Sequence, residues 1–276
     1  MKKILTLALV VASLGGIAQN LTLKWKTEPT LPVPESVLFD AKTKAIYVAC
    51  IDGKPEEKDG KGSIAKLSED GKIISAQWAT GLDAPKGLGI YKDNLYVADI
   101  TRIVTISLAT GKITSKVEVE GAKFLNDVTV DKKGNVYASD TETGKIHILK
   151  GDKAEVYFES PEFKGVNGLL ALDNEMYVLD FATGTNYKLS ADKKLTVFGK
   201  TSEGADGVVP VGKDEYLVSN WNGEVYYISA KGQAKKLIDT KAEKVSAADI
   251  EYDSKTKTLF VPTFFANSVV AYTFSK

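Results

Sequence analysis

The chain contains only one cysteine and one histidine, and its 36 basic and 36 acidic residues leave no formal net charge. Cys50 therefore has no partner for an intramolecular disulfide, and its position in the apolar segment AIYVAC predicts a buried thiol. His147 lies in the alternating segment KIHILK, which predicts a packed or surface side chain and excludes a Ser-His-Asp triad. The balanced charge gives no indication of nucleic acid or an anionic membrane as a partner.

Long hydrophobic runs are also absent, apart from a short one at the N-terminus. Residues 1–20 read MKKILTLALVVASLGGIAQN, with two lysines, an apolar stretch over residues 4–11 and small residues at positions 16 and 18, where a cleavage site is expected. This order is typical of a secretory signal peptide, here residues 1–19, and the run is shorter than the ~20 residues of a membrane span. Cleavage would leave 34 basic against 36 acidic residues, a charge of −2. We expect a secreted or periplasmic protein without membrane insertion; a buried first strand or helix is the alternative.

Six short segments repeat one pattern: IYVAC, LYVAD, VYASD, MYVLD, YLVSN and LFVPT begin 49, 41, 40, 40 and 43 residues apart. An apolar strand and a polar turn precede each segment, and an alternating strand follows it. Four short strands per ~40 residues predict an all-β, six-bladed β-propeller in one domain, residues 20–276. The last copy has no room for a fourth strand, so we expect the segment LTLKWKTE (21–28) to complete that blade and close the ring. A two-sheet sandwich does not explain so regular a repeat.

The first strand of each propeller blade lines the central channel, so the residues that open these strands should reach one face. Two are carboxylates and two are side-chain amides, a set of oxygen donors that suits Ca²⁺ and, to a lesser degree, Mg²⁺ or Mn²⁺. Zinc would normally require histidine or cysteine. A polar, hydrated channel is the alternative that spacing alone leaves open. The six mouth residues are Glu35, Lys86, Asn126, Asn167, Asp206 and Ala248.

Aromatic residues are expected to surround this mouth, and they suit an apolar or planar substrate. Packing between the blades is the competing role for each of them. The Gly-rich, charged loop IDGKPEEKDGKG (51–62) is either a lid over the channel or a solvated surface loop. The chain contains no P-loop motif for a nucleotide. The aromatic candidates are Phe124, Phe163, Phe181, Trp221, Phe264 and Phe265.

The mouth residues fall in the motifs PES, Asn-Asp, Asn-Gly and Asp-Gly, with which the chain resembles the gluconolactonase, regucalcin and senescence-marker-protein family over residues 22–275. This resemblance implies a six-bladed, metal-dependent propeller that hydrolyses a lactone or related ester. It implies Asp206 as metal ligand and general base, with Asp127 as the second candidate for the base. The implied metal ligands are Glu35, Asn126, Asn167 and Asp206.

The chain departs from the family pattern at two positions. Phe124 occupies the place of an arginine that binds substrate hydroxyls in the sugar-lactone members, which argues against sugar-acid lactones as substrates. Lys86 points a cation at the same axis, where it could pair with Asp206 or Asp127, bind an anionic substrate or weaken metal binding. The predicted substrate-binding residues are Lys86, Phe124, Phe181, Trp221 and Phe264.

Two functions from different classes follow from the sequence. One is a monomeric metal-dependent hydrolase that acts on a small-molecule lactone or ester. The other is a secreted propeller that binds a ligand or a protein and catalyses nothing, since the propeller fold hosts many functions. The four oxygen donors favour the enzyme, whereas Phe124 and Lys86 favour the binding protein.

Overall fold

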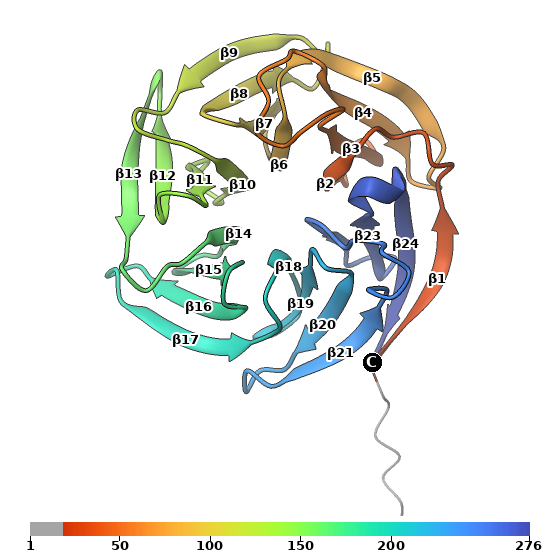
Figure 1. Ribbon diagram of the computed structural model, residues 1–276, viewed down its shortest axis with the longest axis vertical. Coiled ribbons are helices and arrows are strands. Elements are labelled where there is room, and N and C mark those ends of the chain that lie inside the picture. Colours follow the sequence, from red (N-terminus) through yellow and green to blue (C-terminus); the bar gives the residue numbers. More distant parts are fainter. Residues whose placement is uncertain (1–18) are drawn as a thin grey trace, which may run out of the picture.

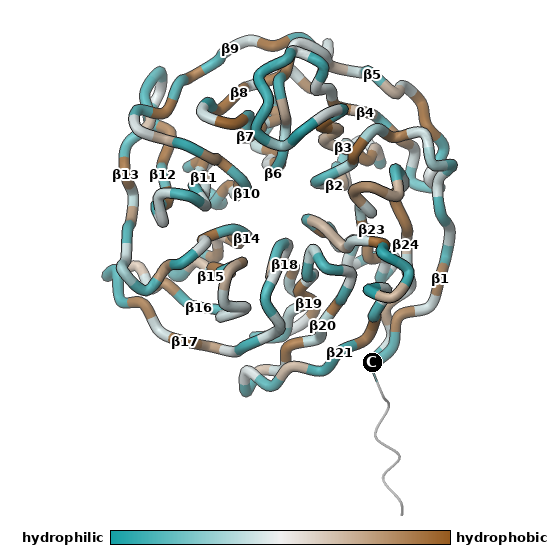
Figure 2. Tube along the Cα trace, viewed as in Figure 1, coloured by the Kyte–Doolittle hydropathy of each residue, from teal (hydrophilic) through white to brown (hydrophobic). Residues whose placement is uncertain are grey.

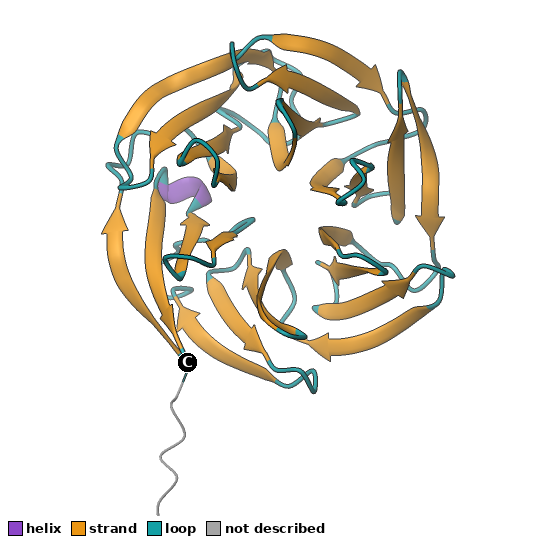
Figure 3. Cartoon of the chain, turned by 180° about the vertical axis from the view of Figure 1, so that it is seen from behind, coloured by secondary structure: helices purple, strands orange, loops and turns teal. Residues whose placement is uncertain are grey.

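A computed structural model describes residues 19–276, so the predicted signal peptide lies almost entirely outside the described residues. Six four-stranded antiparallel sheets surround a central axis (Figure 1). This arrangement confirms the predicted six-bladed β-propeller. The helix of the described part is the short 3₁₀ turn η1 (Phe264–Ala266), and within residues 19–276 no helix is long and apolar enough to cross a membrane. Figure 3 shows the same ring from behind.

The first three blades follow the chain in simple up-and-down order. The first blade contains β2 (Pro34–Asp40), β3 (Ala45–Cys50), β4 (Gly62–Ser68) and β5 (Ile73–Leu82). The second contains β6 (Pro85–Tyr91), β7 (Asn94–Asp99), β8 (Arg102–Ser107) and β9 (Ile113–Glu118). The third contains β10 (Leu125–Val130), β11 (Val136–Asp140), β12 (Lys145–Lys150) and β13 (Lys153–Glu159).

The next two blades repeat this order, and the sixth differs only in its outer strand. The fourth blade contains β14 (Val166–Ala171), β15 (Glu175–Asp180), β16 (Thr185–Ser190) and β17 (Leu195–Lys200). The fifth contains β18 (Ala205–Gly212), β19 (Glu215–Asn220), β20 (Glu224–Ile228) and β21 (Ala234–Asp239). The sixth contains β22 (Glu251–Asp253), β23 (Thr258–Pro262), β24 (Val269–Ser275) and, from the other end of the chain, β1 (Asn20–Lys26).

The strand β1 closes the ring, as the sequence predicted. It pairs antiparallel with β24, from Asn20 opposite Ser275 to Lys26 opposite Val270. The Trp25 ring lies 5.8 Å from the Phe260 ring, measured between centroids, so β1 also packs its side chain onto the sixth blade. The first and last parts of the described chain therefore share one sheet, and the outer edge of β24 is covered.

The inner strands alternate their side chains between the two neighbouring blades. In β3, Tyr47 packs with Leu88 of the second blade, whereas Val48 and Cys50 pack with Phe260 of the sixth. This alternation is the period-two pattern of a strand that is buried on both faces. Cys50 is fully buried, as predicted. Hydrophobic segments and hydrophilic turns succeed one another around the whole ring (Figure 2).

Three of the six shared segments end in an aspartate that holds the loop before the channel-lining strand. In the third blade, the Asp140 carboxylate accepts hydrogen bonds from the backbone N–H groups of Lys123 (3.1 Å) and Phe124 (3.0 Å). These aspartate clamps set the point at which each channel-lining strand begins. The same bonds join Asp99 to Asp83 and Ala84, and Asp180 to Lys164 and Gly165.

We expect closure by β1 to contribute measurably to stability. Trp25→Ala should lower the free energy of unfolding by about 2–4 kcal/mol, because a large aromatic contact with Phe260 is lost. Leu23→Ala is the matched control on the same strand, and it should cost less than about 0.5 kcal/mol because Leu23 is 62% exposed. Urea denaturation checks both; equal effects would contradict a role for the Trp25 contact in closing the ring.

Candidate functional site

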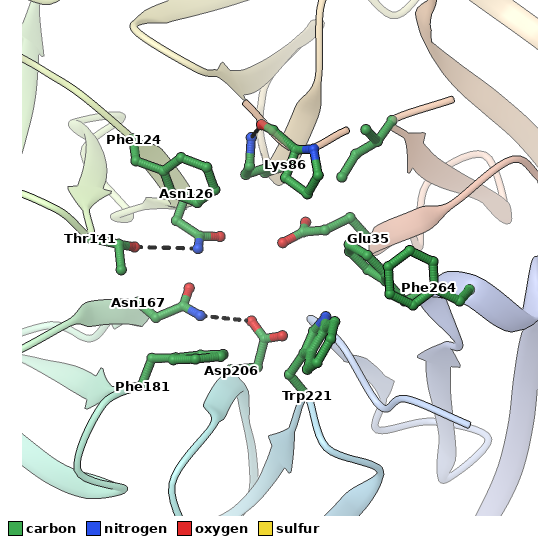
Figure 4. A pocket seen from close by; sticks show the side chains of 13 residues that line it. Glu35, Lys86, Phe124, Asn126, Thr141, Asn167, Phe181, Asp206, Trp221 and Phe264 are labelled. Atoms are coloured by element: carbon green, nitrogen blue, oxygen red, sulfur yellow. Dashed lines mark hydrogen bonds between the residues drawn. The ribbon is translucent and has the colours of Figure 1, made fainter. Parts of the chain in front are cut away.

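Five of the six mouth residues meet in one cavity of about 360 Å³ at one end of the channel. They come from five different blades, and Figure 4 shows the Glu35, Asn126, Asn167 and Asp206 side chains pointing toward a common space. Ala248, the sixth, does not line this cavity and packs against Ile51 and Phe264. The five lining mouth residues are Glu35, Lys86, Asn126, Asn167 and Asp206.

Irregular backbone at the start of each channel-lining strand directs these side chains. The pairing of β2, β6, β10, β14 and β18 with the next strand shifts register at the mouth residue. Such a bulge re-aims a side chain relative to a regular strand. Close contact between neighbouring blades also requires glycine here, because a Cβ atom at Gly168 would overlap the carbonyl oxygen of Asp206.

The amide groups of the mouth are oriented by hydrogen bonds. Asn167 donates from Nδ2 to Asp206 Oδ1 (3.1 Å), and Asn126 donates from Nδ2 to Thr141 Oγ1 (3.3 Å). Both bonds leave the amide oxygens free to face the cavity. Asn167 Oδ1 and Glu35 Oε2 are buried and have no hydrogen-bond partner in the protein. Buried acceptors without partners are costly, so this site is suited to a ligand that binds oxygen.

The four oxygen donors fit the chemistry of a hard cation. They comprise the carboxylates of Glu35 and Asp206 and the amide oxygens of Asn126 and Asn167, and none of these residues is more than 8% exposed. Within residues 19–276, no three histidine, cysteine, aspartate or glutamate side chains form a group that could hold a metal ion. A cation at the mouth would therefore depend on the amide oxygens as well as the carboxylates, as is common for Ca²⁺.

Burial and mutual repulsion raise the pKa of both mouth carboxyls. The pKa of Glu35 lies well above its usual value because the group is desolvated and faces Asp206 and Asp249, although Lys86 opposes the shift. The pKa of Asp206 is also raised, by burial and by Asp249, and its hydrogen bond from Asn167 partly offsets this. In this environment the protonated forms of both carboxyls are favoured unless a cation compensates their charge.

Asp127 does not line the cavity. Its Oδ1 accepts a hydrogen bond from the N–H of Val128 (2.6 Å), and its Oδ2 accepts one from the N–H of Leu169 in the fourth blade (2.6 Å). The carboxylate thus joins two blades beneath the mouth, because the bulge in β10 directs its side chain away from Asn126. The Asp127 carboxylate therefore joins two blades in this geometry, and its role as the second candidate for the base stays a prediction from the sequence.

Two further carboxyls of the sixth blade were missed by the sequence reasoning. Asp249 accepts a hydrogen bond from Ser36 Oγ (2.6 Å), and burial raises its pKa to about 7. Glu251 lies two residues further along the channel, and burial raises its pKa to about 8. The signal was present in the alignment of first strands, where Asp249 follows Ala248 as Asp127 follows Asn126.

Lys86 is buried, and it forms neither of the ion pairs that the sequence left open. Its ammonium donates to the backbone carbonyl oxygens of Pro55 (2.7 Å) and Ala84 (3.0 Å) and lies 4.4 Å from the centroid of the Phe124 ring. Burial lowers its pKa to about 8, although Glu35 acts in the opposite direction. Lys86 therefore ties the loop of residues 51–62 to the cavity, and Ile51 and Pro55 of this region form part of the wall.

The four aromatic residues predicted to bind substrate all line the cavity: Phe124, Phe181, Trp221 and Phe264. Phe265 lies beside them and is 64% exposed. Phe163, which the sequence also placed at the rim, is buried between blades, 5.7 Å from the Tyr187 ring. Phe163 directly precedes Lys164 and Gly165, whose N–H groups bind Asp180, and its ring packs into the apolar cluster between the third and fourth blades. His147 is also buried, in β12 near Asp140, and does not line the cavity.

The fold and the cavity define a six-bladed β-propeller with an oxygen-rich, aromatic-walled channel mouth. No protein-family model matches the chain, and a comparison with curated proteins found no match. Among solved structures, a protein of unknown function from Bacteroides thetaiotaomicron is similar with a TM-score of 0.71 at 12% identity. That match covers 94% of this chain and 76% of the other.

Two neighbours have named functions, and they belong to different classes. Catalytically inactive virginiamycin B lyase from Staphylococcus aureus with quinupristin has a TM-score of 0.65 at 13% identity, covering 93% of this chain and 99% of the other. A chain of a nidogen/laminin complex has a TM-score of 0.64 at 18% identity, covering 79% and 84%. At these identities the likeness shows the propeller fold alone.

The raised pKa of Glu251 predicts a pH-dependent stability. Between about pH 4.5 and about pH 8 the folded state holds a proton that the unfolded state releases, so stability falls as the pH rises through this window. Glu251→Gln has no proton to lose, so its free energy of unfolding should not fall in this window. Between acidic and weakly alkaline pH, the variant should therefore gain on the order of 2 kcal/mol of stability relative to the wild type. Glu243→Gln, at an exposed position, is the control. Urea denaturation at both ends of the window checks this, and parallel pH profiles would contradict it.

Proposed function

We propose that this protein is a metal-dependent hydrolase of a lactone or related ester, with a Ca²⁺-type cation at the channel mouth. The observation that carries the proposal is the convergence of four oxygen donors, of which Glu35 Oε2 and Asn167 Oδ1 are buried without partners. The motifs shared with the gluconolactonase, regucalcin and senescence-marker-protein family agree with this donor set. Mg²⁺ and Mn²⁺ are the alternative cations.

The charge balance around the axis supports a cation. Four carboxyls influence one another there, those of Glu35, Asp127, Asp206 and Asp249. One ammonium, that of Lys86, faces them and is already bound to backbone carbonyls. Fully ionised, this group would carry three uncompensated negative charges in a desolvated place, which is unfavourable. A divalent cation would allow Glu35 and Asp206 to ionise together.

The residues of the mouth have distinct roles in the proposed reaction. When bound, the cation would polarise the ester carbonyl and lower the pKa of a water molecule. Asp206 would take the proton of the attacking water, because burial raises the pKa of its carboxyl and with it the affinity for a proton. A carboxylate that binds a cation is a weak base, so Asp206 would share the water with the cation. The hydrogen bond from Asn167 orients Asp206 for this role.

Histidine has no part in this mechanism. The chain's one histidine, His147, is buried in β12 and is not among the residues that line the cavity. The inactive variant of virginiamycin B lyase carries alanine in place of a histidine, whereas the chemistry proposed here uses no histidine. Asp206 is the base in this proposal.

A non-catalytic binding propeller is the second candidate function. The observation that favours it is the commitment of Lys86, whose bond to Pro55 holds the loop of residues 51–62 against the cavity. An aromatic cavity of this size could bind a small molecule without any cation. Metal binding separates the two candidates, because the hydrolase requires a cation and the binding protein does not.

Calorimetric titration of Ca²⁺ into chelator-treated mature protein tests the proposal. We expect saturable binding at one site, and Asp206→Asn should weaken it by about tenfold or more because a carboxylate ligand is lost. Asp93→Asn is the matched control, since it removes an exposed carboxylate in the turn between β6 and β7, at the opposite end of β6 from Lys86. Failure of the wild type to bind Ca²⁺, Mg²⁺ or Mn²⁺ would leave the binding propeller as the better assignment.

A further inference from the structure

The wall of the cavity, which is formed by aromatic side chains, differs in character from its floor, which is formed by the four oxygen donors and Lys86. Trp221 packs edge to face against Phe264, with ring centroids 5.4 Å apart, and Phe264 packs likewise against Phe265 at 4.7 Å. Phe124 and Phe181 lie on the opposite side of the donor set (Figure 4). Aromatic faces therefore flank the oxygen donors from two sides, and Ile51 and Pro55 extend the apolar surface.

The polar nitrogens at the floor already donate to protein acceptors. The Lys86 ammonium is held by the carbonyl oxygens of Pro55 and Ala84 and by the Phe124 ring. Asn126 Nδ2 donates to Thr141, and Asn167 Nδ2 donates to Asp206. A polyhydroxylated ligand needs several donors and acceptors in the wall, and an anionic ligand needs a free cationic side chain. Each amide nitrogen keeps one N–H beyond its bond to the protein, so the floor offers few donors to a polyhydroxylated ligand, and Lys86 is not free to pair with an anion.

The aromatic wall also selects against a charged ligand. The aromatic side chains that line the cavity carry no charge, and the Lys86 ammonium stays bound to the carbonyl oxygens of Pro55 and Ala84. A charged group enclosed by this wall would lose its water of hydration without gaining a partner of opposite charge. The ligand that the cavity favours is therefore uncharged in the part that the aromatic wall encloses.

We propose that the substrate is an uncharged aryl ester or aryl lactone, whose flat ring lies between Phe181 and Phe124 on one side and Trp221 on the other. This inference rests on the proposed hydrolase function for its chemistry. Hydrolysis adds water across the acyl C–O bond, so the carbonyl carbon gains a hydroxyl group and the leaving oxygen takes the proton. The volume of about 360 Å³ is near the lower end for small-molecule pockets, which suits one or two fused rings.

Stable analogues separate recognition by the wall from catalysis at the floor. Dihydroquinolinone is the lactam of a fused aryl lactone, and gluconolactam is a sugar lactam with the same ring size. Phenylpropionate carries a comparable aryl group and a negative charge. We expect dihydroquinolinone to bind at least about tenfold more tightly than either of the others, measured by calorimetry with Ca²⁺ and again with chelator. Gluconolactam or phenylpropionate binding as tightly as dihydroquinolinone, or more tightly, would overturn the proposal.

Two variants of one side chain test the aromatic contact. Phe181→Ala should weaken dihydroquinolinone binding by about tenfold, whereas Phe181→Tyr keeps the ring and should restore most of the affinity. Thermal unfolding shows whether each variant is folded, and quenching by the ligand of the wild-type tryptophan fluorescence, to which Trp25, Trp78 and Trp221 contribute, gives a second signal. Unchanged binding in a folded Phe181→Ala protein would also overturn the proposal.

The two proposals fail in different experiments. Absence of cation binding would reject the hydrolase, while dihydroquinolinone binding in chelator would still support aryl recognition by the wall. Cation binding without dihydroquinolinone binding would reject the aryl substrate and leave the hydrolase in place. If the protein binds both a cation and dihydroquinolinone, it should hydrolyse dihydrocoumarin, the matching lactone, in the presence of Ca²⁺. It should hydrolyse gluconolactone much more slowly. The reverse order of rates would count against the inferred substrate class.

Discussion

The hydrogen bonds of three buried aspartates determine where the channel-lining strands begin. Asp99, Asp140 and Asp180 each accept backbone N–H bonds from the loop that leads into the first strand of their blade. In spite of burial, the nearby His147 and hydrogen bonds such as that from the Phe124 N–H lower the pKa of Asp140 to about 2, so this group is ionised at neutral pH. Bonds to a buried carboxylate are stronger than neutral ones. The positions of Lys86, Asn126 and Asn167 all depend on these clamps.

The ring could be predicted from the sequence because the spacing of its apolar segments follows the buried strands, and these strands repeat once in each blade. Segments such as LYVAD and MYVLD carry both signals: apolar residues that face two neighbouring blades, and the terminal aspartate that clamps a loop. The partnership of β1 with β24 also followed from counting strands. Side-chain direction at the mouth did not follow, because the bulges turn adjacent residues to different faces. Asn126 reaches the cavity, whereas its neighbour Asp127 joins two blades.

The electrostatics of the mouth were hidden from the sequence for another reason. They arise from residues that are distant along the chain, such as Lys86 and the carbonyl group of Pro55, or Ser36 and Asp249. Sequence spacing identifies which residues open the strands, but it does not show which of them find partners in loops. Lys86 is the clearest case, since its ammonium binds a loop of the first blade. This bond leaves the carboxyls at the axis without a free cationic side chain, which supports the proposed cation alongside the four oxygen donors.

Floor and wall of the cavity are built from different parts of the blades, and they meet where Lys86 contacts Phe124 and Pro55. The floor comes from the bulged starts of the first strands, whose backbone is held by the clamps and by contacts such as that of Gly168 with Asp206. The wall comes from residues just beyond the shared segments, such as Phe181 and Trp221, whose side chains are not needed to close the ring. Substitution of the wall would change the ligand while the donor set remained. At 12–18% identity the structural neighbours share the propeller fold, which does not by itself specify the wall of the channel mouth.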